Sequence, residues 1–349
     1  MSEAVAISVV MSTRNRAQYL PDALQTLAAQ QCDAPFEVIV IDNGSSDNTP
    51  ALLGAWCRKD PRFRTAREPR PGLSRGKNAG IRMARGALLL FTDDDVRVDP
   101  QWVAAYRDLF ARRLDALVLA GGPIVPIPHD LGGWPDWFDD AARADVGLLH
   151  HREQRVLGTS EYVWGGNMAV PRRLFDELGL WKESAGLQGD DRVLLQSSEF
   201  FEDTEFQDRV RNAGGSVWFC PGAVVQHRVD RRTITPRRIV STAFSRGRND
   251  IWVQELPLWR EVRCVPKQNA LRCLLALAGS LVRWCLWAIM FRLSERKAVF
   301  ERARCAAFTS GRSLDSLRAG RSSMRWFRGA SRIAFPARRL LLRLTPDVA

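Results

Sequence analysis

Two hydrophobic patterns alternate along the first 115 residues of the chain. Continuous runs rich in Val, Ile and Leu, which are typical of strands buried on both faces, cover residues 5–12, 36–42 and 87–92. Between these runs, apolar positions such as Leu20, Leu24 and Leu27 fall at helical spacing. The pattern predicts helices over 17–30, 49–58 and 74–85, and a short strand near 63–67. Strands alternating with helices predict βαβ units, a parallel sheet and therefore an α/β fold.

The alternation weakens beyond residue 115. The predicted elements there are a strand over 116–122, a loop rich in Pro, Gly and Trp over 123–140, and helices over 171–178, 203–213 and 236–254. The segment 270–293 is strongly apolar, but three arginines interrupt it. No uncharged stretch reaches the roughly 20 residues that a membrane-spanning helix needs.

Charge divides the chain more clearly than hydropathy does. The formal net charge is +12, and residues 262–349 hold 18 Lys and Arg against four acids, a net of +14. The other 261 residues hold 33 bases and 35 acids, a net of −2. We therefore predict a main domain over 1–260, which the motifs below mark as the catalytic one, and a helical, Arg-rich region over 261–349. Because Leu, Phe and Trp are interleaved with the arginines, this region suits an anionic membrane surface.

The cysteines and the N-terminus bear on the compartment. Seven cysteines are scattered without a CxxC pair, so neither a zinc site nor a disulfide scaffold is indicated. The first apolar run is short and Arg14 and Arg16 follow it, which is typical of a strand rather than a signal peptide. We expect a cytoplasmic protein, peripheral on the inner face of the cell membrane.

The sharpest local signal is FTDDDV at 91–96. Side chains at Asp93 and Asp95 project to the same side of an extended segment, so both can address one cation. Oxygen ligands select a hard divalent ion, Mg²⁺ or Mn²⁺, which can in turn hold a diphosphate. The alternative is a solvated acidic turn before the helix that starts near Pro100. Asp42 also ends a strand, and ligands of parallel sheets bind beyond the carboxyl ends of strands, so both sites are predicted in one crevice.

A second acidic signal is FEDTEF at 201–206, where a helix opens. Asp203 shares a helix face with Phe206 and Val210, which places it toward the rest of the domain. A carboxylate at a helix start is favoured by the helix dipole and stays ionised, as a general base must. An ordinary N-terminal cap is the alternative.

Three weaker signals carry further candidates. GLSRGKNAGI at 72–81 holds Lys77, whose charge suits a phosphate, although a plain surface loop is the alternative. WGGNMAV at 164–170 holds Asn167, which either borders a sugar or belongs to a tight turn. His227 is either a further metal ligand or a structural histidine.

Taken together, these segments resemble the family 2 inverting glycosyltransferases, which have the GT-A fold. The resemblance runs in order over residues 6–250 through the segments ISVVMSTRNRAQYLPDALQTLAAQ, VIVIDNGSSDNT, GLSRGKNAGIRMARGALLLFTDDDV, GGNMAVPRRLF and FEDTEFQDRVRNAGGSVWFCPGAVVQHRV. It implies a Rossmann-like mixed sheet flanked by helices. It also implies transfer of a sugar from a nucleotide-diphosphate sugar to a hydroxyl acceptor.

The resemblance also implies roles for individual residues. Asp42 would bind the nucleotide base, with Ser12, Thr13 and Arg14 beside it. Lys77 would lie near the diphosphate, as would Asp93 and Asp94. Asp95 would be the direct ligand of the metal, and Asp203 would be the general base, with one displacement inverting the anomeric carbon.

The sequence departs from the family pattern in two places. Phe201 precedes the Glu-Asp pair where family members commonly have Gly, and Asp190 and Asp191 form a second acidic pair that competes for the role of base. The QxxRW signature of processive polysaccharide synthases is absent, which favours transfer of single sugars.

Two other functions compete with this interpretation. A sugar-phosphate nucleotidyltransferase would place a glycine-rich loop after the first strand, but STRNRAQYL there contains no glycine. A non-catalytic basic protein would bind nucleic acid through the Arg-rich region. The interleaved apolar residues favour a membrane over nucleic acid, so no nucleic acid partner is expected.

Overall fold

The computed structural model of the chain describes residues 6–114, 116–135, 151–159, 161–183, 202–232 and 278–287, with 138, 143, 149, 234–235, 238–239, 289–290, 303, 306–307 and 310. Two compact units comprise Met1–Ile127 with Leu149–Arg228, and Pro128–Leu148 with Val229–Ala349. The domain boundary predicted after residue 260 falls in 240–277, outside the described residues, and stays a prediction. Most of the helix predicted over 236–254 also lies outside them.

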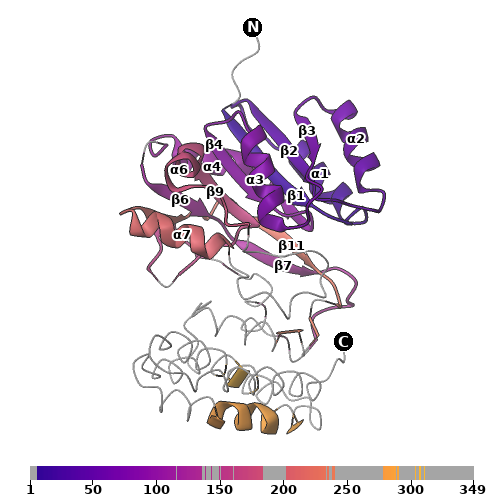
Figure 1. Ribbon diagram of the computed structural model, residues 1–349, viewed down its shortest axis with the longest axis vertical. Coiled ribbons are helices and arrows are strands. Elements are labelled where there is room, and N and C mark those ends of the chain that lie inside the picture. Colours follow the sequence, from indigo (N-terminus) through magenta and orange to yellow (C-terminus); the bar gives the residue numbers. More distant parts are fainter. Residues whose placement is uncertain are drawn as a thin grey trace. The chain divides into compact units, whose positions relative to one another are not determined.

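A mixed sheet is the centre of the first unit (Figure 1). Among the described residues it has eight strands in the order β3-β2-β1-β4-β9-β6-β10-β8. The bounds of these strands are β1 (Ile7–Thr13), β2 (Phe36–Asp42), β3 (Phe63–Arg67), β4 (Leu88–Thr92), β6 (Val118–Gly121), β8 (Arg155–Val156), β9 (Asn167–Pro171) and β10 (Ser216–Phe219). A second, three-stranded sheet has the order β5-β11-β7, with β5 (Val96–Val98), β7 (Ile124–Pro128) and β11 (Val225–Val229).

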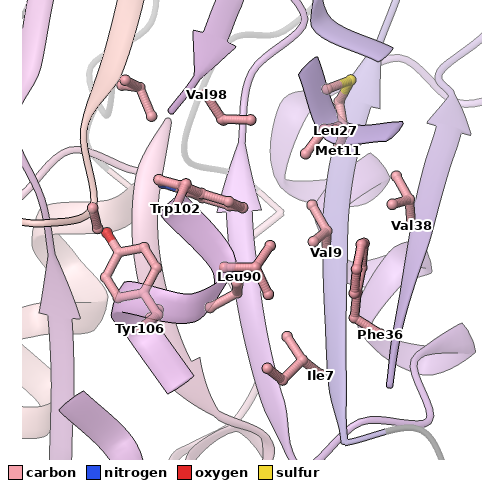
Figure 2. Packing of buried hydrophobic residues seen from close by; sticks show 14 of the residues in the cluster. Ile7, Val9, Met11, Leu27, Phe36, Val38, Leu90, Val98, Trp102 and Tyr106 are labelled. Carbon is pink, nitrogen blue, oxygen red and sulfur yellow. The ribbon is translucent and has the colours of Figure 1, made fainter. Parts of the chain in front are cut away.

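Helices cover both faces of the large sheet, as the alternation along its strands requires. Val9 and Met11 of β1 belong to one hydrophobic cluster, with residues of α1 (Leu20–Ala28), α2 (Thr49–Lys59) and α4 (Trp102–Phe110). Figure 2 shows part of this cluster, with Trp102 near Leu90. Val10 belongs to the cluster on the other face, with residues of α3 (Leu73–Met83), α6 (Arg172–Leu178) and α7 (Glu202–Asn212). The predicted fold, a mixed α/β sheet flanked by helices, is confirmed.

The carboxyl ends of the parallel strands line up at one edge. Thr13 of β1 is level with Asp42 of β2, and Asp42 is level with Arg67 of β3. Thr92, the last residue of β4, is level with Met11 of β1. The strand order reverses between β1 and β4, which is the position where open α/β sheets bind ligands. The residues after β1, β2 and β4 therefore meet at this edge.

β7 and β9 lie in segments for which the sequence predicts a loop and a turn. Residues 124–128, predicted as part of a loop, form β7, and residues 167–171, predicted as a turn leading into a helix, form β9. β9 runs antiparallel between β4 and β6. Both segments are short and contain Pro, which weakens a strand signal, but their partners lie far away in the sequence and supply the ladder hydrogen bonds.

The second unit contains a described helical stretch at residues 278–287 and 289–290, drawn in orange in Figure 1. Ser280 and Trp284 are buried, and the hydroxyl oxygens of Ser280 and Ser310 lie 2.9 Å apart. Val282, Leu286, Ile289 and Met290 are exposed. Within the described part of the chain, no helix is both long and apolar enough to cross a membrane.

Candidate active site

The acidic segment after β4 is partly buried. The side chain of Asp94 is 10% exposed and that of Asp95 is 20% exposed. Burial and the neighbouring charge of Asp95 raise the pKa of Asp94 to about 8, although Arg16 and Thr13 oppose the shift. Burial also raises the pKa of Asp93, against the charge of Lys77. The described cations therefore do not balance these carboxylates, and an additional positive charge would stabilise their ionised forms.

Lys77 joins this segment to the second acidic segment. It lies on α3, and its Nζ donates a hydrogen bond of 3.0 Å to Oε1 of Glu202, the first residue of α7. The two side chains are only 3% and 5% exposed. Glu202, Asp93 and Asp203 together favour the charged lysine and raise its pKa, although burial acts in the opposite direction. The structure thus brings the two predicted acidic segments together around one buried ammonium group.

Two glycines of the WGGN turn allow this close packing. A Cβ at Gly165 would lie 2.7 Å from Nζ of Lys77 and 3.2 Å from Cβ of Asp203. A Cβ at Gly166 would lie 2.3 Å from Oδ2 of Asp93. The turn therefore passes directly beside all three charged side chains, and any larger residue would displace them.

Asp203 is held by backbone groups on both carboxylate oxygens. Oδ2 accepts a 2.7 Å hydrogen bond from the N–H of Gly165, and Oδ1 accepts a 2.8 Å hydrogen bond from the N–H of Thr204. A carboxylate has about four acceptor positions, so it can still take up a proton. Burial and the charge of Glu202 raise the pKa of Asp203 to about 6, against Lys77 and the two N–H groups. Such a group is poised for proton transfer near neutral pH.

The structure places the three predicted metal ligands in two different surroundings. Residues 94 and 95 form a turn rather than an extended segment, so the alternation that placed Asp93 beside Asp95 does not apply. Asp93 packs against Gly166, whereas Oδ1 of Asp95 faces Nε2 of His227 at 3.7 Å. Within the described residues, no group of three or more His, Cys, Asp or Glu side chains is arranged to hold a metal.

The Asp95–His227 pair nevertheless fits one cation. A separation of 3.7 Å is too long for a hydrogen bond. Two ligands that each lie about 2.1 Å from one ion are at most about 4.2 Å apart, so the pair can share a small divalent ion. Arg16 flanks the same carboxylates, with Nη2 4.0 Å from Oδ2 of Asp95 and Nε 3.8 Å from Oδ1 of Asp94.

The predicted nucleotide-binding residues lie at the same edge of the sheet. Ser12 and Thr13 end β1, and Arg14 follows them. Oδ1 of Asp42 accepts a 2.9 Å hydrogen bond from the N–H of Ser45. Oδ2 of Asp42 is buried, lies 3.8 Å from Nε of Arg67, and accepts no hydrogen bond from the described residues. It is therefore an acceptor suited to an N–H donor of a ligand.

The chain is similar to known proteins over part of its length. Residues 8–179 match the family described as glycosyl transferase family 2. The segment 8–179 therefore belongs to glycosyl transferase family 2. Over 109 residues the chain is 36% identical to the uncharacterized glycosyltransferase YfnE of Bacillus subtilis, a match that covers 31% of this chain and 26% of YfnE.

Two further comparisons define how far the family 2 likeness extends. The chain is 30% identical over 201 residues to the succinoglycan biosynthesis protein ExoO of Rhizobium meliloti, which covers 55% of each chain. The crystal structure of GalNAc-T7 with UDP, GalNAc and Mn²⁺ has a TM-score of 0.50 at 18% identity, over 74% of this chain and 52% of GalNAc-T7. This last likeness concerns the GT-A fold alone. The chain spans only 26% and 55% of the lengths of YfnE and ExoO.

Asn167 does not have the predicted role in this family 2 site. It is fully buried, and its Nδ2 donates to the carbonyls of Pro123 and Ala223 at 2.9 and 2.8 Å. Its Oδ1 accepts hydrogen bonds of 2.8 Å from Nε1 of Trp102 and the hydroxyl of Tyr106, two side chains labelled in Figure 2. The amide is thus fully used inside the protein and has no group left for a sugar. Asn167 is a structural residue that fixes the start of β9.

Sequence reasoning missed Glu202, Arg16 and the glycine pair as parts of the site. Glu202 directly precedes Asp203 in the sequence, so a role could have been predicted for both residues of the Glu-Asp pair. Arg16 lies shortly after β1, where the sequence instead indicated nucleotide binding by Ser12, Thr13 and Arg14. The structure also shows that the first partner of Lys77 is Glu202, and the predicted contact between Lys77 and a diphosphate stays a prediction.

Replacing Asn167 by alanine should reduce stability strongly. The change removes four buried hydrogen bonds. The Tyr106 hydroxyl can still donate to the carbonyl of residue 167 and the Pro123 carbonyl still accepts from the N–H of Val225, but Nε1 of Trp102 and the carbonyl of Ala223 lose their partner. Each of these two groups costs about 1–3 kcal/mol, so we expect a loss of about 2–6 kcal/mol in the free energy of unfolding, measured by urea denaturation. A variant of normal stability that binds nucleotide sugars more weakly would instead restore a ligand-binding role for Asn167.

Proposed function

We propose that the chain transfers a single sugar from a nucleoside-diphosphate sugar to a hydroxyl acceptor, with inversion at the anomeric carbon. The observation that carries the proposal is the meeting of the Asp93–Asp95 segment with Glu202 and Asp203 at the sheet edge that also presents Asp42. Family 2 membership supports the reaction class. The sugar-phosphate nucleotidyltransferase and the non-catalytic binder remain alternatives, and a product assay separates them from a transferase.

The donor nucleotide would occupy the edge formed by β1, β2 and β4. The buried Oδ2 of Asp42 is proposed to accept a hydrogen bond from the base, with Ser12, Thr13 and Arg14 beside it. The diphosphate would then lie toward Asp94 and Asp95. Arg16 reaches both of these carboxylates, and its guanidinium is suited to phosphate oxygens as well.

A divalent ion, Mn²⁺ or Mg²⁺, is proposed to bind between Asp95 and His227. Two protein ligands leave positions for diphosphate oxygens, which is how a small hard cation is often held beside a nucleotide. When bound, the ion stabilises the negative charge of the departing nucleoside diphosphate. Asp93 is proposed to lie beside this pair of ligands, where its carboxylate also interacts with Lys77.

Asp203 is proposed to be the general base. The acceptor hydroxyl must lose its proton as its oxygen attacks the anomeric carbon, and Asp203 can take this proton while both of its oxygens stay oriented by N–H groups. One carboxylate and a single displacement give inversion. Asp190 and Asp191, the predicted competitors, lie outside the described residues.

Substitution of Asp203 and Asp95 should separate catalysis from donor binding. Asp203→Asn keeps the shape but cannot take a proton, so kcat should fall about 10²–10⁴-fold with nearly unchanged donor affinity. Asp95→Asn removes a charge from the proposed cation site, so Mn²⁺-dependent donor binding should be lost. Calorimetry with a panel of UDP-, GDP- and dTDP-sugars measures affinity, and release of nucleoside diphosphate on acceptor addition measures turnover.

Asp190→Asn and Asp191→Asn serve as controls in the same assays. Normal turnover by Asp203→Asn together with loss of turnover in either control would move the base to that residue. Donor binding that survives both EDTA and Asp95→Asn would remove the cation from the mechanism. Absence of donor binding and of transfer with every nucleotide sugar of the panel would contradict the proposed function itself.

Turnover should decline in mild acid. The base must be ionised, and the pKa of Asp203 is raised to about 6, so the active form is lost as the pH falls through that value. We expect kcat to decrease about tenfold per pH unit below about pH 6 and to be level above it until another group titrates. A kcat that stays constant between about pH 5 and pH 7 would contradict this assignment.

We further propose that the second unit binds an anionic membrane surface. Val282, Leu286 and Ile289 follow helical spacing and are 59%, 55% and 45% exposed, whereas Ser280 and Trp284 on the opposite face are buried. Exposed apolar side chains on one helix face, within a region of net charge +14 at 262–349, match a helix that lies in the headgroup layer.

Replacing Leu286 and Ile289 together by glutamate should release the protein from vesicles. Burial of each side chain contributes about 1.5–3 kcal/mol, so binding should weaken about 100-fold or more in co-sedimentation with phosphatidylserine vesicles. Val156→Glu alters a residue of similar exposure, 50%, in the first unit and should bind as the unaltered protein does. Equal binding by the Leu286/Ile289 double variant would exclude this face.

A further inference from the structure

Lys77 and Glu202 form a buried ion pair. Both side chains are nearly fully buried, and their 3.0 Å hydrogen bond joins α3 to the first turn of α7 across 125 residues of sequence. Removing two charges from water costs several kcal/mol each, and replacement by apolar residues is often neutral or stabilising. A contribution to stability alone therefore does not account for this ion pair. Its position beside the reacting groups indicates another role.

The pair lies directly behind Asp203. Glu202 and Asp203 are consecutive residues in the first turn of α7, so any displacement of one carries the other with it. The ammonium group of Lys77 also interacts with Asp203 itself and with Asp93. Gly165, which donates to Asp203, passes so close that a Cβ there would lie 2.7 Å from Nζ of Lys77. The ammonium group of Lys77 is thus close to Glu202 and Gly165, two neighbours that hold Asp203.

We propose that Lys77 and Glu202 form a positioning device that holds Asp203 in place for proton transfer. The inference rests on the proposed function and adds two positioning residues to it. Without the ammonium group, Glu202, Asp203 and Asp93 would repel one another, and the first turn of α7 would move away from α3. A displacement of about 1 Å at a reacting group can cost about 10²-fold in rate.

A rival role is a direct contact between Lys77 and the diphosphate of the donor. The ammonium group has three N–H donors and Glu202 accepts one of them, so donor capacity alone does not decide between the roles. The two roles differ in what they control. A diphosphate contact contributes to donor affinity, whereas a positioning device contributes to kcat and requires Glu202.

A double-mutant cycle of Lys77→Met, Glu202→Gln and the combined variant tests the proposal. Each single variant should lower kcat about 10²-fold and change the donor dissociation constant less than about threefold. The combined variant should lose no more kcat than the worse single variant, because both residues act as one unit. It should also unfold at a higher temperature than Lys77→Met alone, since Glu202 no longer adds a buried negative charge beside Asp203 and Asp93.

Glu37→Gln is the matched control. Glu37 is buried and paired with Arg64 at 2.6 Å, but it lies near the amino end of β2, away from the carboxyl edge. Its substitution should lower the unfolding temperature and leave kcat within about twofold. A positioning role predicts that Glu37→Gln lowers stability without lowering kcat. It also predicts that the combined Lys77/Glu202 variant keeps its loss of kcat when its stability returns. General destabilisation predicts neither result.

Three results would overturn the inference. An increase of tenfold or more in the donor dissociation constant of Lys77→Met with unchanged kcat would assign Lys77 to the diphosphate. Losses of kcat that multiply in the combined variant would show independent roles. Recovery of kcat together with stability in the combined variant would leave the pair merely structural. The transfer assay of the unaltered protein is done before the double-mutant cycle. If that protein transfers no sugar from any donor of the panel, the proposed function itself is contradicted.

Discussion

Repulsion between carboxylates is the constraint on which the rest of this site depends. Asp93, Asp94 and Asp95 end one strand and Glu202 and Asp203 open one helix, and the fold brings both groups toward Lys77. The buried ammonium group of Lys77 is a positive charge shared by the two segments, through Asp93 on one side and Glu202 and Asp203 on the other. The pKa values of Asp93, Asp94 and Asp203 are nevertheless raised, so the site carries more negative charge than its described cations balance. An additional cation, such as the one proposed between Asp95 and His227, would stabilise the ionised forms of these carboxylates.

Close backbone packing is what makes this charge cluster geometrically possible. A Cβ at Gly76 would lie 2.0 Å from Oγ of Ser12, and one at Gly80 would lie 2.4 Å from Cγ1 of Val10, so α3 can approach β1 only through glycine. That approach carries Lys77 over the sheet edge. Gly165 and Gly166 do the same for the turn before β9. Glycines thus determine how near the charged side chains come to each other, although none of these glycines is itself charged.

The sequence predicted the parts of the fold whose signals are local. β2 and β3 were predicted with the bounds that the structure has, because continuous apolar or alternating residues mark them. β9 was missed because a five-residue strand with no local partner looks like a turn, and only β4 and β6 define it. Asn167 was assigned to a ligand for the same reason: its polar side chain is visible in the sequence, but Trp102, Tyr106 and two distant carbonyls are not. The sequence suggested a phosphate as the partner of Lys77, and it did not indicate the contact with Glu202, which is 125 residues away.

The small sheet explains how His227 reaches the acidic segment, which no local pattern indicates. β11 pairs antiparallel with β5, and this register places His227 opposite Val96, the residue after Asp95. The N–H of Arg228 also donates to the carbonyl of Asp95 at 2.9 Å, so backbone bonds fix both sides of the Asp95–His227 pair. These backbone hydrogen bonds hold the two side chains next to each other, 3.7 Å apart at Oδ1 and Nε2. The three-stranded sheet therefore belongs to the site as much as the large one does, because the large sheet gathers the carboxylates and the small sheet brings His227 to them.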